Sequence, residues 1–263
     1  MNENDPRPPV DEPEWRSDPN APVAPGDDLP HCDKCGNKRF VVDQAGNLHP
    51  CAHCGVAHRW RVQSVANFSS RNRFTESQTF VTFRTDVDGQ ESAVLRRCLR
   101  TAEKFAEAPD GKWLVIWGER GNGKSHLCAA VDNHLREAGV AVIFVTAPDL
   151  FAALRRSMDL DRTTEQESYS GRMRTFKEAQ ALILDDLGAE TSSAWSEGVL
   201  FEILDFRYRN RLPTMIASNV PPEHFDPRLA SRMQDKAFSV VLTNTAPDFR
   251  QRTDRKRGKR GEE

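Results

Sequence analysis

The sequence predicts an α/β fold, in which a parallel sheet is flanked by helices and preceded by a small zinc-ribbon module. Three observations carry this prediction. From about residue 90, apolar strand-like runs alternate with helix-like segments, the pattern of a parallel sheet with helices on both faces. Residues 118–125 fit a phosphate-binding loop between a strand and a helix. Two Cys-x-x-Cys pairs, at 32–35 and 51–54, have the spacing of a zinc ribbon.

The elements of the predicted sheet follow one another along the chain. An amphipathic helix over 91–108 ends at Pro109-Asp110-Gly111, and the apolar run Trp113 to Trp117 then reads as a strand. The polar stretch 159–170 is expected to be mobile. The remaining expected elements are strands at 140–145, 181–184, 214–217 and 238–242 and helices at 124–138, 147–158, 195–210 and 226–236.

The run Gly118 to Ser125 matches Gly-x-x-x-x-Gly-Lys-Ser without a mismatch. Its backbone N–H groups are expected to face a phosphate, Lys124 to reach the β- and γ-phosphates, and the Ser125 hydroxyl to bind Mg²⁺. A flexible surface turn is the alternative, which the flanking strand and helix disfavour. A nucleoside triphosphate and Mg²⁺ are therefore the expected ligands, and the resemblance given below identifies the nucleotide as ATP. The expected cofactor-binding residues are Gly118, Glu119, Arg120, Gly121, Asn122, Gly123, Lys124, Ser125, His126 and Asp185.

Polar side chains end two later strands, at 181–184 and 214–217. Asp185 and Asp186 close one strand, at the edge where parallel sheets bind their ligands. We expect Asp185 to hold Mg²⁺, mostly through water, and Asp186 to position or activate the attacking water. Asn219 follows the next strand and reads as a γ-phosphate sensor. Exposed aspartates and an asparagine at turns are the alternative interpretation.

Four cysteines are expected to present a tetrahedral set of thiolates to Zn²⁺, because two tight turns separated by fifteen residues suit this geometry. The residues between the pairs are consistent with a small hairpin. So short a region has almost no core, so the metal would supply much of its folding free energy. A redox dithiol pair or free thiols remain the alternatives. The expected ligands are Cys32, Cys35, Cys51 and Cys54.

Four ordered motifs resemble the AAA+ ATPases of the DnaC/DnaI helicase-loader and IstB transposition-helper group. They read G-E-R-G-N-G-K-S, L-I-L-D-D-L-G-A-E, R-Y-R-N-R-L-P-T-M-I-A-S-N and R-L-A-S-R-M, and the similarity covers roughly residues 75–250. The resemblance implies a P-loop AAA+ sheet that is lidless, because only about twenty residues follow the last expected strand.

The resemblance also implies roles for residues outside the phosphate loop. Arg232 corresponds to an arginine finger that acts on ATP held by a neighbouring subunit, and Arg228 often assists. Self-association in the ATP state follows from such a finger. Phe80 and Phe83 fall in an element near the adenine. Asp186 replaces the glutamate common elsewhere in AAA+ proteins, which predicts slow, switch-like hydrolysis of ATP to ADP.

Composition predicts how the chain is divided. Residues 1–30 hold eight acidic and two basic side chains with few apolar ones, which is typical of disorder. The last fourteen residues hold seven Arg or Lys against three acids, which suits either a nucleic-acid or acidic partner or a solvated end. The expected segments are a disordered acidic tail (1–30), a zinc-binding module (31–60), a linker with the start of the ATPase domain (61–89), the AAA+ ATPase domain (90–250) and a basic tail (251–263).

The leading functional prediction is an ATP-dependent replicative helicase loader for DNA replication initiation. It would bind single-stranded DNA and deliver a hexameric helicase, with the zinc module gripping that partner. The alternatives are an IstB-like transposition helper and a zinc-ribbon DNA-binding protein with a nucleotide-dependent clamp. A GTPase is disfavoured because no Asn-Lys-x-Asp element follows the strands. No secretory signal or membrane-length apolar run is present, so a cytoplasmic location is expected.

Overall fold

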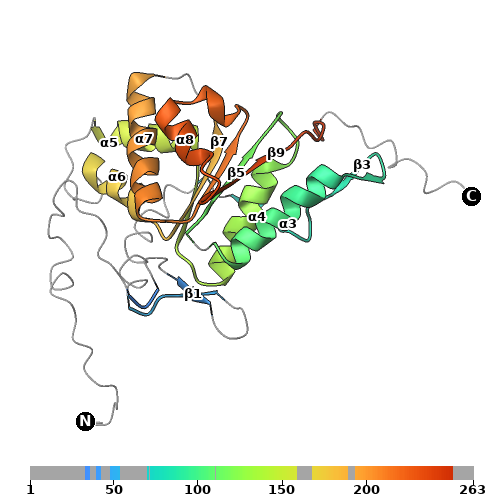
Figure 1. Cartoon of the computed structure of the whole chain (residues 1–263), viewed down its shortest axis with the longest axis horizontal. Coiled ribbons are helices and arrows are strands. Elements are labelled where there is room, and N and C mark those ends of the chain that lie inside the picture. Colours follow the sequence, from blue (N-terminus) through green and yellow to red (C-terminus); the bar gives the residue numbers. More distant parts are fainter. Residues whose placement is uncertain are drawn as a thin grey trace, which may run out of the picture.

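The computed structural model describes residues 33–35, 40–42, 48–53, 70, 72–109, 111–158, 168–188 and 193–250. Figure 1 shows a sheet at the centre of the molecule with helices packed on both of its faces, which confirms the α/β prediction. In this part of the chain, no helix is long and apolar enough to cross a membrane.

Five parallel strands form the sheet, in the order β6-β7-β8-β5-β9. The central strands contain continuous apolar runs because helices cover both faces of the sheet. In β5, for example, Trp113, Leu114, Val115 and Ile116 are all buried. The strands are β5 (Trp113–Trp117), β6 (Val142–Thr146), β7 (Ala181–Leu187), β8 (Thr214–Ser218) and β9 (Ser239–Thr243).

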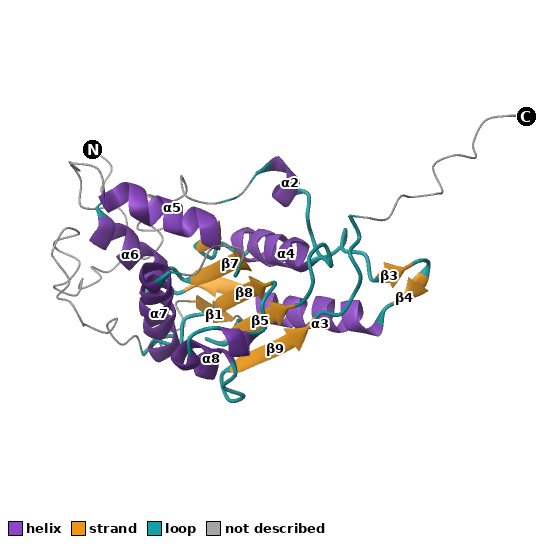
Figure 2. Ribbon diagram, turned by 90° about the horizontal axis from the view of Figure 1, so that it is seen from above, coloured by secondary structure: helices purple, strands orange, loops and turns teal. Residues whose placement is uncertain are grey.

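The helices divide between the two faces, and each face has its own apolar core (Figure 2). α3 (Ala93–Glu107) and α4 (Lys124–Glu137) cover one face. The other face carries the second group of helices. Alternate side chains of β5 serve the two cores, because successive strand residues point to opposite faces. The second group is α5 (Ala147–Met158), α6 (Tyr169–Glu178), α7 (Ala194–Arg209) and α8 (Pro227–Met233).

The structure adds elements that the sequence pattern did not indicate. α6 has a polar composition that hides its buried side, where Met173 and Phe176 face the core. Ser168 caps the start of this helix, which therefore begins within the stretch 159–170 that was expected to be mobile. Residues 159–167 of that stretch lie outside the described part. β7 also continues to Leu187, beyond the expected strand. The other additions are α2 (Arg73–Glu76), η4 (Pro222–His224) and a hairpin of β3 (Asp86–Val87) and β4 (Gln90–Glu91).

The described residues before α3 divide into two parts. β1 (Phe40–Val42) pairs antiparallel with β2 (Leu48–Pro50), which forms the hairpin expected between the cysteine pairs. The second part lies nearer the sheet. There, the Asn133 side chain of α4 donates to the carbonyl of Gln78 at 2.8 Å, which attaches the segment before α3 to α4. The domain boundaries remain predictions.

One buried cation joins three elements on the second face. Arg207 of α7 is fully buried, and its guanidinium donates to the side-chain oxygen of Thr214 at 2.9 Å. It also caps the end of α6 by donating to the carbonyl of Ala179 at 2.8 Å. Further acceptors are the carbonyls of Phe176, Lys177 and Pro213. Burial lowers the pKa of Arg207 to about 9, still above neutral pH.

Replacing Arg207 with Met should lower the free energy of unfolding by about 3 kcal/mol or more, since several buried carbonyls then lose their donor. The matched control is Arg209→Met on the same helix, whose half-exposed ion pair with Asp205 contributes about 0–1 kcal/mol. Urea unfolding of both variants measures the difference. Equal losses would contradict the bridging role of Arg207.

Candidate nucleotide-binding site

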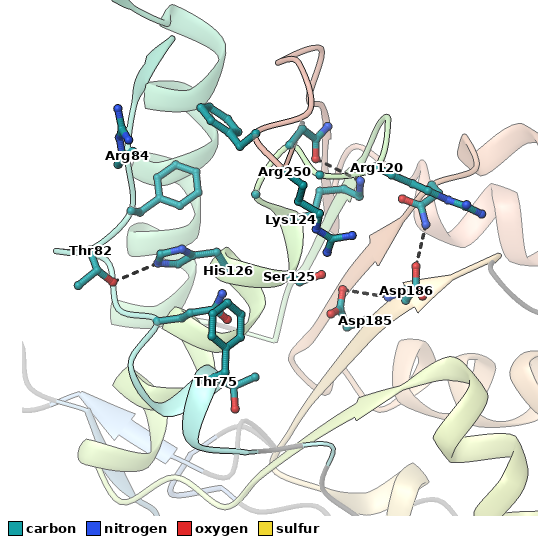
Figure 3. Close-up of a pocket in the computed structure, with 18 of the residues that line it drawn as sticks. Thr75, Thr82, Arg84, Arg120, Lys124, Ser125, His126, Asp185, Asp186 and Arg250 are labelled. Atoms are coloured by element: carbon teal, nitrogen blue, oxygen red, sulfur yellow. Dashed lines mark hydrogen bonds between the residues drawn. The ribbon is translucent and has the colours of Figure 1, made fainter. Parts of the chain in front are cut away.

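A cavity of about 1240 Å³ opens at the carboxyl edge of the sheet (Figure 3). The phosphate loop forms its floor, and Asp185, Asp186 and Asn219 line it from the ends of β7 and β8. The segment before α3 supplies the opposite wall, with Thr82 and Phe83 among its residues. This volume is large enough for a nucleotide, because ligand pockets commonly measure about 300–1,000 Å³.

The phosphate loop lies between β5 and α4 and is already shaped around Lys124. This side chain is buried, and its ammonium donates to the carbonyls of Gly118 at 2.8 Å and Glu119 at 2.6 Å. The side-chain oxygen of Asn122 accepts a third bond at 3.1 Å. Burial lowers the pKa of Lys124, and the nearby Asp185 carboxylate opposes this shift. The ammonium is therefore held inside the loop, where a phosphate would meet it.

Asp185 and Ser125 form the pair expected for magnesium. Burial of Asp185 raises its pKa, and a hydrogen bond from the Ser125 side chain acts in the opposite direction. A hydroxyl and a carboxylate are hard oxygen ligands of the kind that Mg²⁺ prefers. Within the described residues these two groups fit the ion, with the remaining positions left to water and phosphate.

Asp186 has an unusual backbone conformation that directs its carboxylate toward β8. Its φ of 55° is left-handed, and the pairing of β7 with β8 shifts register between Leu184 and Leu187. Such strain costs about 1–3 kcal/mol and concentrates at functional sites. The Asn219 side chain donates to the Asp186 carboxylate at 2.7 Å, as Figure 3 shows for the dashed contact at Asp186. The amide thereby fixes the orientation of this carboxylate at the cavity.

His126 fastens the wall of the cavity to α4. Its Nε2 lies 2.9 Å from the carbonyl of Thr79 and 3.3 Å from the Thr82 hydroxyl. The Phe83 ring packs edge-on against the imidazole at 5.2 Å between centroids. Burial lowers the pKa of His126, which favours the neutral ring. Phe83 lines the cavity, whereas Phe80 packs on the core beside it.

Arg232 and Arg228 do not line this cavity but lie on α8. The Arg232 guanidinium pairs with Asp205 and donates to the carbonyl of Arg228 at 2.7 Å. Both guanidinium groups stack over the Phe201 ring, at 5.0 Å and 4.1 Å from its centroid. A role for Arg232 in ATP chemistry therefore needs a site on another subunit.

The expected zinc ligands are only partly within the described residues. Cys35 and Cys51 are both buried and pack together, although 15 residues separate them in the sequence. Cys32 and Cys54 lie outside the described residues. Among the described residues, no three metal-ligating side chains form a group, so the zinc site remains a prediction.

Sequence reasoning missed one wall of the cavity. Phe249 and Arg250, from the segment after β9, line it beside the phosphate loop. In the sequence, Arg250 is the last residue of the expected ATPase domain and the first of a basic run, and no motif marks it as a site residue. The position of this segment depends on contacts with residues that are distant in the sequence, and composition alone does not predict such contacts.

Asp186→Asn should leave nucleotide binding nearly unchanged and slow ATP hydrolysis by about 10²–10⁴-fold, the usual contribution of a positioned general base. Asparagine tolerates left-handed backbone and keeps an oxygen for the Asn219 amide. Lys124→Ala, in contrast, should abolish tight binding itself. Calorimetric titration with ATP and Mg²⁺ and a phosphate-release assay separate the two effects. Undiminished hydrolysis by Asp186→Asn would contradict its assignment.

The chain is similar to proteins of known name. Over 178 residues it is 25% identical to the replicative helicase loader DnaC of Escherichia coli K12, covering 67% of this chain and 69% of that protein. It is 29% identical over 137 residues to the replicative helicase loader DnaI of Bacillus subtilis 168, covering 52% of this chain but only 42% of DnaI.

Solved structures support the fold. A crystal structure of the DnaC helicase loader superposes with a TM-score of 0.56 at 23% identity, covering 66% of this chain and all of that one (100%). AMPPCP-bound DnaA from Aquifex aeolicus gives a TM-score of 0.53 at 20% identity over 64% of this chain, and the match spans half (50%) of the DnaA chain.

The family described as "IstB-like ATP binding protein" matches residues 61–245, which include the phosphate loop, both aspartates and α8. This match extends over most of the chain, from before the cavity wall to the end of the sheet. The chain therefore belongs to the family of IstB-like ATP binding proteins and has the AAA+ ATPase fold of the DnaC and DnaI helicase loaders.

Proposed function

We propose that this protein is an ATP-dependent loader of a replicative DNA helicase. It binds ATP with Mg²⁺ and single-stranded DNA, and it delivers a hexameric helicase onto that strand. Hydrolysis of ATP to ADP is slow and serves as a switch. The similarity to DnaC and DnaI supports the loading role, and the Asp186–Asn219 contact at the cavity is the single observation that supports hydrolysis.

The residues of the cavity divide the chemistry among them. Lys124 would donate to phosphate oxygens, and Ser125 and Asp185 would hold Mg²⁺, which would neutralise charge on the phosphates. Asp186 orients the attacking water, and Asn219 keeps that carboxylate in place. Asp186 has one methylene fewer than glutamate, so its reach toward the water is shorter and turnover is slow.

The N-terminal segment is proposed to grip the helicase. Cys35 and Cys51 already lie together, and Zn²⁺ held by these residues with Cys32 and Cys54 would fold the module around them. The proposed module spans residues 31–60 and precedes an ATPase domain at 90–250, between an acidic tail and a basic tail. Because a helicase loader acts where DNA is replicated, we propose a cytoplasmic location.

A transposition helper is the second candidate, because the matching family takes its name from IstB. The two candidates predict different partners. A loader binds a hexameric helicase through its N-terminal segment, whereas a transposition helper binds a transposase on DNA. The cysteine pairs before the ATPase domain favour the loader.

With ATP present, the full chain should capture a purified replicative helicase in a pull-down assay. The capture should be lost when residues 1–70 are removed. The truncated protein should still bind ATP in calorimetry, which controls for folding of the ATPase domain. The full chain should contain one equivalent of zinc, and the truncated protein should contain none. Helicase capture by the truncated protein, or none by the full chain, would contradict the proposed gripping role.

Self-association in the ATP state is the remaining part of the proposal, with Arg232 acting on a neighbouring subunit. Arg232→Ala and Lys124→Ala should each be nearly inactive, since an arginine finger contributes about 10³–10⁵ in rate. Mixing them should restore ATPase activity, because one variant supplies an intact cavity and the other an intact Arg232. A mixture of Lys124→Ala with the double variant should stay inactive. No recovery in the first mixture would refute the shared site.

A further inference from the structure

The segment that follows β9 lies across the phosphate loop and is bonded to it in three places. Asn122 donates its side-chain amide to the carbonyl of Asn244 at 2.8 Å, and Asn244 returns the bond to the carbonyl of Asn122 at 2.9 Å. Both asparagines are fully buried. Further along, the Phe249 amide donates to the carbonyl of Gly121 at 3.0 Å. Residues 244–250 are called the loop strap below.

The loop strap approaches closely at two glycines of the loop. A Cβ on Gly118 would lie 2.1 Å from the Asn244 carbonyl oxygen, and one on Gly121 would lie 1.7 Å from the Asp248 carboxylate. Both glycines also have positive φ, of 152° and 73°. The glycines of the motif therefore make room for the loop strap as well as for a phosphate.

Asp248 fixes the direction in which the loop strap leaves the loop. Its carboxylate accepts from the backbone N–H of Arg250 at 2.8 Å. Figure 3 shows the Arg250 side chain extending from this turn toward Lys124 and Ser125, on the side of the cavity where the loop begins α4. The guanidinium thus faces the place where the phosphates are expected.

Arg250 differs from the other cations that line the cavity. Arg84 is paired with Asp86 at 2.9 Å, and Lys124 is bonded to loop carbonyls. In the part of the chain that the structure describes, no carboxylate pairs with the Arg250 guanidinium. Arg120 also has no such partner there, but Figure 3 shows its side chain extending away from Lys124 and Ser125.

We propose that Arg250 binds the triphosphate of ATP within its own subunit, as a second cation opposite Lys124 that the loop strap positions. The inference rests on the proposed ATP site and assigns it a residue outside every motif. A guanidinium suits this task because its planar N–H groups donate to two phosphate oxygens at once. The contact adds charge neutralisation at the far phosphates, so its effect should grow with the number of phosphates.

The test compares Arg250→Gln with wild type in calorimetric titrations with AMP-PNP and with AMP, each with Mg²⁺. AMP-PNP affinity should fall by about tenfold, the size of one charged hydrogen-bonded contact, while AMP affinity changes less than twofold. Arg250→Lys should recover part of the loss. The matched control is Arg100→Gln, which removes the same charge from the exposed face of α3.

Each outcome separates this inference from the function that it rests on. If wild type binds no AMP-PNP, the ATP site itself is refuted. If wild type binds and Arg250→Gln binds equally well, only the role of Arg250 is refuted. Equal losses in Arg250→Gln and Arg100→Gln would show a general charge effect and would also overturn the contact. Melting temperatures of the nucleotide-free variants check that each is folded.

Discussion

The alignment of parallel strand ends at one edge of the sheet is the constraint on which the site depends. β5, β7 and β8 lie side by side, although more than sixty residues separate β5 from β7 in the chain. Their carboxyl ends deliver a phosphate loop, two carboxylates and an amide to one cavity. The helices that connect the strands pack on both faces of the sheet and keep the strands in this order. The apolar cores therefore position the residues of the site indirectly.

Strong local patterns made most of this arrangement predictable. The alternation of buried strands with helices gave the order of elements, and the motif from Gly118 to Ser125 located the loop. The motifs also predicted that Asp186 and Asn219 follow strands of the same sheet, and the structure adds that their side chains are in contact. The chemical role of each remains a prediction.

What the sequence could not indicate depends on contacts between distant segments. α6 is polar because Arg172 and Glu178 lie on its buried side, so no apolar stripe marks it. Arg207 looks like one of many surface arginines, yet it is fully enclosed by carbonyls from two segments of the chain. The left-handed backbone at Asp186 and the position of Arg250 likewise arise from tertiary packing, for which single residues carry no pattern.

The bonds of Lys124 to its own loop have a consequence for ligand entry. Gly118 and Glu119 accept from the ammonium, so bonds within the protein itself hold the loop in its shape. A nucleotide then meets a loop that is already shaped and does not have to order a flexible chain. Little conformational entropy is lost at that step, and more of the interaction energy remains available as affinity.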